Sequence, residues 1–279
     1  MWYQVNVSSL SSSLHCGRMA SSTLRHRHGS FDMDKYELQK YEPMKNKSES
    51  ARIRASQSPD ATIAGVIAHD LMQWVLESGI SNQESSIKQL KKCLHQLTQS
   101  DFTHQLTQDF IKDLMPSSVH DARLQLIIEK TTGLIRSWER FLDKFTVESI
   151  HSERAMWREL DSFEGERTFL LARADAIVYT PDGQIVLEFK TGNLSKTSEW
   201  INQLELYATL LDGDVYKLAI LHPNKSGHIS PKGIQIAGFL DRTDEEIPGN
   251  HCKKCPYSSN SRCDTYEQWE LSIRTPILV

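Results

Sequence analysis

Two acidic residues and a lysine, Asp175, Glu188 and Lys190, stand in otherwise apolar segments of this 279-residue chain. Glu188 and Lys190 are two residues apart in IVLEFK, so their side chains share one face if the segment is a strand. Two carboxylates that converge suit Mg²⁺ or Mn²⁺, and a nearby lysine can position water or offset negative charge. A salt-bridge cluster on an edge strand is the alternative interpretation.

A β-hairpin is predicted to bring these three residues together. Segments 167–180 and 184–190 have the composition of strands, and they flank the turn sequence TPDGQ. A turn centred near Asp182 and Gly183 would place Asp175 opposite Lys190, with Glu188 as the diagonal neighbour. This prediction depends on register, because a shift of one residue would move the side chains to opposite faces.

Helices are predicted to precede the hairpin, starting with one from Asp60 to Gly79 whose apolar residues recur at helical spacing. Further helices are expected over 84–98, 101–114, 121–146, 198–211 and near 264–273, and further strands over 215–223 and 233–240. The sequence therefore predicts an α/β protein in three parts. These are an extension over 1–59, a helical subdomain over 60–160 and an α/β core over 161–279.

Composition limits the class of protein. The formal net charge of -4 argues against a protein that coats nucleic acid by bulk attraction, although a local basic groove remains compatible with it. No run of about 18 apolar residues is present, so no membrane span is expected. Residues 1–59 begin with a Ser-, His- and Arg-rich stretch and are predicted to be disordered; an organelle-targeting leader is the alternative.

The cysteines are odd in number and unevenly placed. Five cysteines without an apolar N-terminal signal predict a reducing, intracellular setting, namely the cytoplasm. Cys252, Cys255 and Cys263 form a C-x2-C-x7-C group, which predicts a metal site that needs a fourth ligand. Candidates for that ligand are Cys93, His251 and Cys16; a group of cysteines without metal is the alternative.

The spacing Asp175-x12-Glu188-x-Lys190 resembles the D…(D/E)-x-K signature of the PD-(D/E)XK nuclease superfamily. The resemblance covers about residues 60–270. It implies a restriction-endonuclease-like core, in which a mixed central sheet is flanked by helices, and metal-dependent hydrolysis of phosphodiester bonds. By this resemblance Asp175, Glu188 and the backbone carbonyl of Phe189 bind Mg²⁺ or Mn²⁺, and Lys190 is the catalytic lysine.

Two further motifs resemble the RecB-type branch of that superfamily. Gly65-x3-His69 resembles its upstream histidine motif, and Gln203-x3-Tyr207 resembles its Q-x3-Y motif. The resemblance implies that His69 is a metal ligand and that Gln203 and Tyr207 act near the scissile strand. From the residues alone, His69 can equally be a core histidine and Tyr207 part of an apolar stripe.

The cysteine arrangement is similar to that of RecB-like nucleases with a four-cysteine iron–sulfur cluster, which include the AddB nucleases and the CRISPR-associated adaptation exonucleases. In those proteins one cysteine precedes the nuclease core and three follow it. The resemblance therefore implies a [4Fe-4S] cluster held by Cys93, Cys252, Cys255 and Cys263. A zinc site that includes His251 is the alternative.

Basic and aromatic residues near the motifs predict a nucleic-acid-binding surface. The basic residues are Arg136, Arg140 and Lys144, which recur every fourth position, and Arg173. Trp138 and Trp157 are candidate platforms on which bases could stack. An ordinary solvated helix face is the alternative.

Together these features predict a metal-dependent DNA nuclease, specifically an exonuclease of DNA repair or recombination that acts on single strands or free ends and carries a structural iron–sulfur cluster. Two alternatives remain. One is a nucleic-acid-binding or CRISPR-adaptation subunit that keeps the nuclease fold, and the other is a zinc-stabilised endonuclease.

Overall fold

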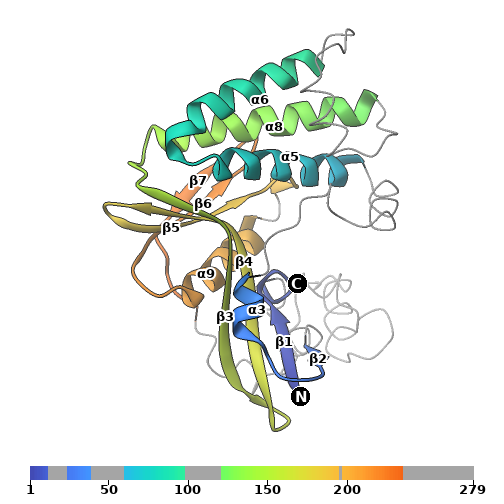
Figure 1. Ribbon diagram of the computed structural model, residues 1–279, viewed down its shortest axis with the longest axis vertical. Helices are drawn as coiled ribbons and strands as arrows, with labels where there is room; N and C mark the ends of the chain where they lie inside the picture. The colour runs from blue at the N-terminus through green and yellow to red at the C-terminus, as the bar shows by residue number, and fades with distance from the viewer. Residues whose placement is uncertain (12–23, 39–59, 98–120, 195–196, 235–279) are drawn as a thin grey trace, which may run out of the picture.

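The computed structural model describes residues 1–11, 24–38, 60–97, 121–194 and 197–234. The strands within these residues form one seven-stranded mixed sheet in the order β2-β1-β4-β5-β6-β7, and β3 pairs with the other edge of β4. Helices cover both faces of the sheet (Figure 1). The prediction of an α/β protein with a mixed central sheet flanked by helices is confirmed.

The long antiparallel hairpin of β3 (Ser149–Phe163) and β4 (Glu166–Thr180) places β4 inside the sheet, whereas β3 pairs only with β4 among the described strands. β5 (Gly183–Phe189) runs antiparallel to the second half of β4. The sheet continues with β6 (Val215–Leu221), parallel to β5, and β7 (Gly227–Ile229), antiparallel to β6. The strands predicted over 167–180, 184–190 and 215–223 are therefore present with small changes of boundary.

The β4–β5 register differs from the predicted one by two residues. Ala176 pairs with Leu187 and Thr180 pairs with Gly183. One step further along the same register, Asp175 stands opposite Glu188 and not opposite Lys190. Because side chains alternate with a period of two, this shift leaves all three residues on the face that the sequence predicted.

Apolar residues alternate along the central strands, so each face of the sheet packs against its own layer of helices. Ala176 and Leu187 contribute to a core with α5 (Asp60–Glu77), α6 (Gln83–Leu97) and α8 (Asp121–Leu142). Ile177 and Val186 face the opposite way, into a second core with α9 (Thr197–Leu210) and α1 (Val7–Leu10). A short 3₁₀ turn, η2 (Ile80–Asn82), joins α5 to α6.

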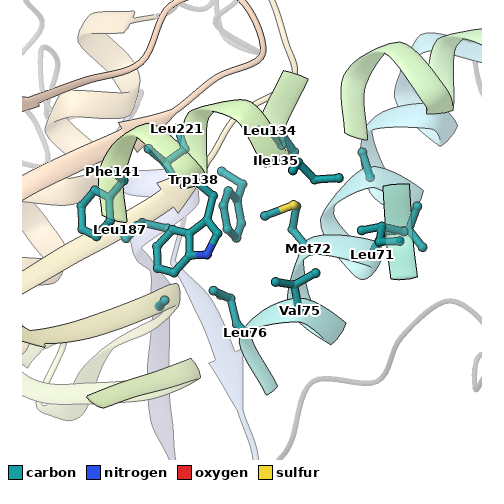
Figure 2. Close-up of a cluster of buried hydrophobic side chains, with 14 of the residues drawn as sticks. Leu71, Met72, Val75, Leu76, Leu134, Ile135, Trp138, Phe141, Leu187 and Leu221 are labelled. Carbon is teal, nitrogen blue, oxygen red and sulfur yellow. The ribbon is translucent and has the colours of Figure 1, made fainter. Parts of the chain in front are cut away.

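Trp138 of α8 is fully buried in the first of these cores, close to Leu187 and Leu221 (Figure 2). Its ring stacks on Phe141, with ring centroids 5.1 Å apart. The interpretation of Trp138 as a platform for bases is therefore wrong, because its position on the helix faces the sheet and not the solvent. Trp157, the second candidate, is half-buried and packs edge-on against Phe31.

The first residues of the chain differ from the predicted disordered extension. β1 (Trp2–Asn6) pairs in parallel with β4, and Val5, Val7 and Leu10 are buried. The chain then forms β2 (Arg25–Arg27), an exposed edge strand on β1, and α3 (Met33–Leu38), which contacts β3. These few apolar residues suffice to order the segment, because β4 offers β1 an open edge that the local composition does not reveal.

The predicted boundary between helical and α/β parts also shifts. The structure begins β3 at Ser149, inside the segment predicted to be helical up to residue 160, and α8 ends at Leu142, before residue 146. β3 is rich in charged residues because much of it is exposed, and this weakens its strand pattern. The helix predicted over 101–114, most of the strand predicted over 233–240 and the helix predicted near 264–273 lie outside the described residues.

None of the helices in the described part of the chain is long and apolar enough to cross a membrane.

Candidate active site

β4 changes partners in the middle of its length. β1 pairs with it from Arg167 to Leu171, and β5 pairs with it from Ala176 to Thr180. Between these two stretches, residues 172–175 are paired with neither strand in the described sheet, and Asp175 lies at the end of this break, beside β5. A break of this kind leaves backbone groups on a central strand that need other partners.

The two acidic side chains take over part of the hydrogen bonding between β4 and β5. Asp175 Oδ2 accepts a hydrogen bond from the Phe189 backbone N–H at 2.6 Å, and Glu188 Oε2 lies 3.5 Å from the Asp175 backbone nitrogen. On its other side, β5 is still held by β6, because the Lys190 N–H donates to the Leu221 carbonyl at 2.9 Å. The carboxylates therefore lie between the diverging strands.

Lys190 and Gln203 bind the Glu188 carboxylate from the α9 side. Lys190 Nζ lies 2.7 Å from Glu188 Oε1 and 2.9 Å from Gln203 Oε1. Gln203 Nε2 donates to the same Glu188 oxygen at 3.0 Å and also to the Tyr207 hydroxyl. Gln203 and Tyr207 are four residues apart on α9, so both reach the site from one helix face. The predicted set of Glu188, Lys190, Gln203 and Tyr207 is thus brought together.

His69 approaches from the opposite layer. Its Nδ1 lies 3.7 Å from Asp175 Oδ2, and its ring packs edge-on against Phe189 with centroids 6.0 Å apart. Gly65, one helical turn earlier on α5, allows this approach, because a Cβ added there would lie only 2.5 Å from Thr191 Oγ1. The Gly-x3-His spacing therefore has a steric reason: the small residue lets the helix approach the end of β5.

Burial dominates the ionisation of the three central groups. It raises the pKa of Asp175 to about 6, although the positive charge of Lys190 and the Phe189 N–H act in the other direction. Burial and the negative charge of Asp175 raise the pKa of Glu188 to about 7, against the pull of Lys190. Burial lowers the pKa of His69 to about 4, so its imidazole is neutral near pH 7 and retains a lone pair for a metal.

Sequence reasoning missed two charged residues of this region. Glu153 of β3 stands at the register position across from Asp175, between the pairs Ser152–Ala176 and Arg154–Ala174, and its backbone φ is 50°. Burial, followed by the negative charge of Asp175, raises its pKa to about 8. The register of the β3–β4 hairpin would have revealed Glu153, but the local sequence does not predict a strand there.

The second missed residue is Lys130 of α8, whose Nζ donates to the Thr191 carbonyl at 2.8 Å. Burial lowers its pKa. Lys130 belongs to no recognisable motif, and its approach to the site follows only from how α8 packs beside α5.

The residues present fit a hard divalent cation in their chemistry. Glu188 is buried and Asp175 is half-buried, their burial raises the pKa of both carboxyls, and a neutral imidazole is adjacent. In the arrangement described, however, Glu188 is turned to Lys190 and Gln203, and among the described residues no three His, Cys, Asp or Glu side chains are placed to hold one ion together. Asp175, Glu188 and His69 remain the predicted ligands.

The residues predicted to bind nucleic acid are scattered. Arg136 and Arg140 are exposed on α8, whereas Lys144 lies beyond the end of that helix. Arg173 is half-buried, and its guanidinium donates to the Glu153 carbonyl at 3.1 Å. Two of the four therefore form a short exposed stripe on α8, and Arg173 belongs to the wall of the acidic site.

Of the predicted cluster ligands, Cys93 is half-buried on α6. Cys252, Cys255 and Cys263 lie outside the described residues, as do the alternative ligands His251 and Cys16. The predicted iron–sulfur or zinc site is therefore not tested by the structure.

The mixed sheet with flanking helices, together with the Asp175, Glu188 and Lys190 group, defines an α/β protein of the restriction-endonuclease-like class. A family comparison matches residues 45–232 to the PD-(D/E)XK nuclease superfamily. The chain belongs to this superfamily, whose members are nucleases that generally use Mg²⁺ or Mn²⁺. The predicted membership of the PD-(D/E)XK nuclease superfamily is thus confirmed, whereas the assignment to the RecB-type branch stays a prediction.

Among solved structures, the crystal structure of SSO0001 is 20% identical to this chain, covers 61% of it and 92% of its own length, and superposes with a TM-score of 0.33. No protein with curated function matches the chain significantly.

We expect Gly65→Ala to lower the free energy of unfolding by about 1–2 kcal/mol, because the new methyl group would overlap Thr191 Oγ1. In an unstrained helix the same change would stabilise by up to about 1 kcal/mol. Chemical denaturation of Gly65→Ala, Thr191→Ala and the double variant measures the coupling. Recovery in the double variant is expected; a Gly65→Ala protein as stable as the wild type would contradict the close packing.

The raised carboxyl pKa values predict how stability depends on pH when no metal is present. Asp175 and Glu188 hold protons more tightly in the folded chain than in the unfolded chain, so their contribution is complete below about pH 4 and is lost as pH rises through about 6 to 7. His69 acts in the opposite direction, because its lowered pKa penalises folding as pH falls below its ordinary value.

The difference in Tm between the wild type and the Asp175→Asn/Glu188→Gln variant isolates the carboxyl contribution. In EDTA, the wild type should lose stability relative to the variant between pH 5 and pH 8, and Mn²⁺ should restore it at pH 8. A wild type that gains stability relative to the variant over this range would show that the carboxyls are not held protonated by burial.

Proposed function

We propose that this protein is a metal-dependent DNA nuclease that degrades single strands from their ends, with Asp175, Glu188 and Lys190 at its centre. The observation that carries the proposal is the meeting of a buried carboxylate, a half-buried carboxylate and a lysine where β4 and β5 separate, in a chain of the PD-(D/E)XK nuclease superfamily. The similarity of the motif order to RecB-type nucleases supports a role in DNA repair or recombination.

Asp175 and Glu188 would hold the divalent ion, with His69 and the Phe189 carbonyl as further ligands. When bound, such an ion polarises a phosphoryl oxygen and lowers the pKa of a water molecule. Near pH 7 the pKa of Glu188 lies close to the solution pH, so a nearby cation favours its charged form. The neutral His69 can donate its lone pair without first losing a proton.

Lys190 would act on the attacking water and on the charge that develops on the phosphate. Its ammonium is aimed by two acceptors, Glu188 Oε1 and Gln203 Oε1, which restrict its rotamers before substrate arrives. Gln203 is itself oriented by its hydrogen bond to the Tyr207 hydroxyl, so two residues of α9 fix the direction of the Lys190 side chain. The pair Gln203 and Tyr207 therefore positions the reacting group.

DNA would be held by charge on the helical layer. Arg136 and Arg140 are exposed on α8, and the guanidinium of Arg140 donates to Ser137 Oγ at 3.1 Å. Salt-dependent contacts of such residues with phosphates supply affinity without sequence preference. Single-strand preference rests on the motif resemblance.

We further propose a structural [4Fe-4S] cluster on Cys93, Cys252, Cys255 and Cys263, with zinc and His251 as the alternative. α6, which carries Cys93, packs on α5, which carries His69. A cluster at Cys93 would therefore brace the helical layer that brings His69 to the site.

A cleavage assay tests the main proposal. The wild type with Mg²⁺ or Mn²⁺ should degrade labelled linear single-stranded DNA and leave circular DNA intact. Glu188→Gln and Lys190→Met should each reduce the rate by roughly a hundredfold, because the first weakens the hold on the divalent ion and the second removes the ammonium that offsets negative charge developing on the phosphate. Asp182→Asn, at the exposed tip of the same hairpin, is the matched control and should retain full activity. Undiminished cleavage by Glu188→Gln would exclude this site, and cleavage of circles would favour an endonuclease.

Anaerobically purified protein tests the cofactor proposal. The wild type should show visible-range absorption and bound iron, and Cys93→Ser should lose both together with thermal stability. Cys16→Ser, in the polar N-terminal stretch, is the control and should keep its iron. Bound zinc with a colourless wild type would support the alternative site, and full iron content in Cys93→Ser would rule out Cys93 as a ligand.

A further inference from the structure

We propose that His222 is a positioning residue of the nuclease centre: its ring fixes the turn after Lys190 and so sets the direction of the lysine. The inference rests on the proposed function for its consequence in catalysis, but the anchoring itself follows from contacts that do not involve the acidic site. His222 is buried and directly follows β6, the strand that holds the end of β5.

Both ring nitrogens of His222 are engaged. Nδ1 accepts a hydrogen bond from the Asn224 backbone N–H at 3.1 Å, so Nε2 is the ring nitrogen that can donate. Nε2 then donates to the Gly192 carbonyl at 2.9 Å. The ring also stacks on Trp200 of α9, with centroids 5.9 Å apart and planes 26° apart. These three contacts leave the imidazole a single orientation.

The backbone of His222 is fixed as well. Its carbonyl accepts hydrogen bonds from Ser137 Oγ of α8 at 2.9 Å and from Ser226 Oγ at 3.0 Å, and its N–H donates to Ser226 Oγ at 2.9 Å. Groups from α8, α9 and the β6–β7 connection thus meet at this one residue. Because these contacts restrict His222 from several sides, its ring can hold the neighbouring turn in place.

The turn that His222 holds begins at the proposed catalytic lysine. The Lys190 N–H donates a hydrogen bond to the carbonyl of Leu221, the residue before His222, and this bond holds the end of β5 against β6. The next two carbonyls are taken by side chains, Thr191 by Lys130 Nζ at 2.8 Å and Gly192 by His222. Since β4 has diverged from β5 here, these bonds replace the missing strand in fixing the path of the chain after Lys190.

The hydrogen bond from His222 to the Gly192 carbonyl orients the turn after Lys190 more than it adds to the stability of the fold. Gly192 is exposed, so water could satisfy its carbonyl if the imidazole were absent. A neutral hydrogen bond of this kind contributes only modestly to folding. Its removal should therefore loosen the turn and the lysine without unfolding the sheet, which separates a positioning role from a purely structural one.

The test compares His222→Ala, His222→Gln and His228→Ala in the full chain. The glutamine amide can still donate to Gly192, and His228 is an exposed imidazole on β7 that serves as the matched control. Two quantities are measured: kcat and KM on linear single-stranded DNA, and amide hydrogen exchange of the peptide that spans residues 189–194.

We expect His222→Ala to lower kcat by about tenfold at unchanged KM, corresponding to about 1.4 kcal/mol in the barrier, and to speed exchange in the 189–194 peptide. His222→Gln should recover most of kcat and of the exchange protection, and His228→Ala should change neither. If His222→Ala does not fold, the glutamine variant decides the matter: near-normal turnover and exchange protection in it support the positioning role, and a loss of either would overturn that role.

Unchanged exchange in His222→Ala would overturn the anchoring, and faster exchange with unchanged kcat would overturn the positioning role. A change in KM alone would assign His222 to substrate binding and would also overturn the proposal. A wild type that cleaves no DNA would refute the proposed function and with it the catalytic role of His222, whereas the exchange data would still decide whether the ring anchors the turn.

Discussion

The structure depends on the separation of β4 from β5 at Asp175 and Glu188. In a regular sheet the backbone groups of neighbouring strands bind one another, but here a carboxylate accepts the Phe189 N–H, and the other carboxylate lies within reach of the Asp175 N–H. Each acid is therefore fixed by the backbone of the opposite strand. Fixing both at a break in the ladder places two negative charges where an apolar sheet cannot neutralise them.

The rest of the site follows from this electrostatic strain. Burial raises the pKa of both acids. Lys190, at the end of β5, and the amide of Gln203, on α9, both bind the Glu188 carboxylate. The helix on the other face contributes a neutral imidazole, which adds a metal donor without adding charge. This balance is incomplete without a cation, so the site is suited to gain one.

The sequence could predict the residues of the site better than their arrangement. Asp175, Glu188 and Lys190 were identifiable because charged groups in apolar strands are rare, and the period of two kept them on one face although the register was displaced by two residues. Glu153 and β1 were missed for the same reason: both depend on which strand lies beside β4, and that is a tertiary choice. The prediction that Trp138 lies on the surface was wrong. Basic residues lie near it in the sequence of α8, but Trp138 is on the helix face that packs on the sheet.

Binding of Mn²⁺ to the intact chain, followed by the electron paramagnetic resonance signal of the free ion, tests the central claim most directly. The account predicts that the wild type removes Mn²⁺ from solution, that Asp175→Asn binds it at least about tenfold more weakly, and that Asp182→Asn binds it as the wild type does. Equal binding by the wild type and Asp175→Asn, or none by either, would contradict a cation site between the diverging strands.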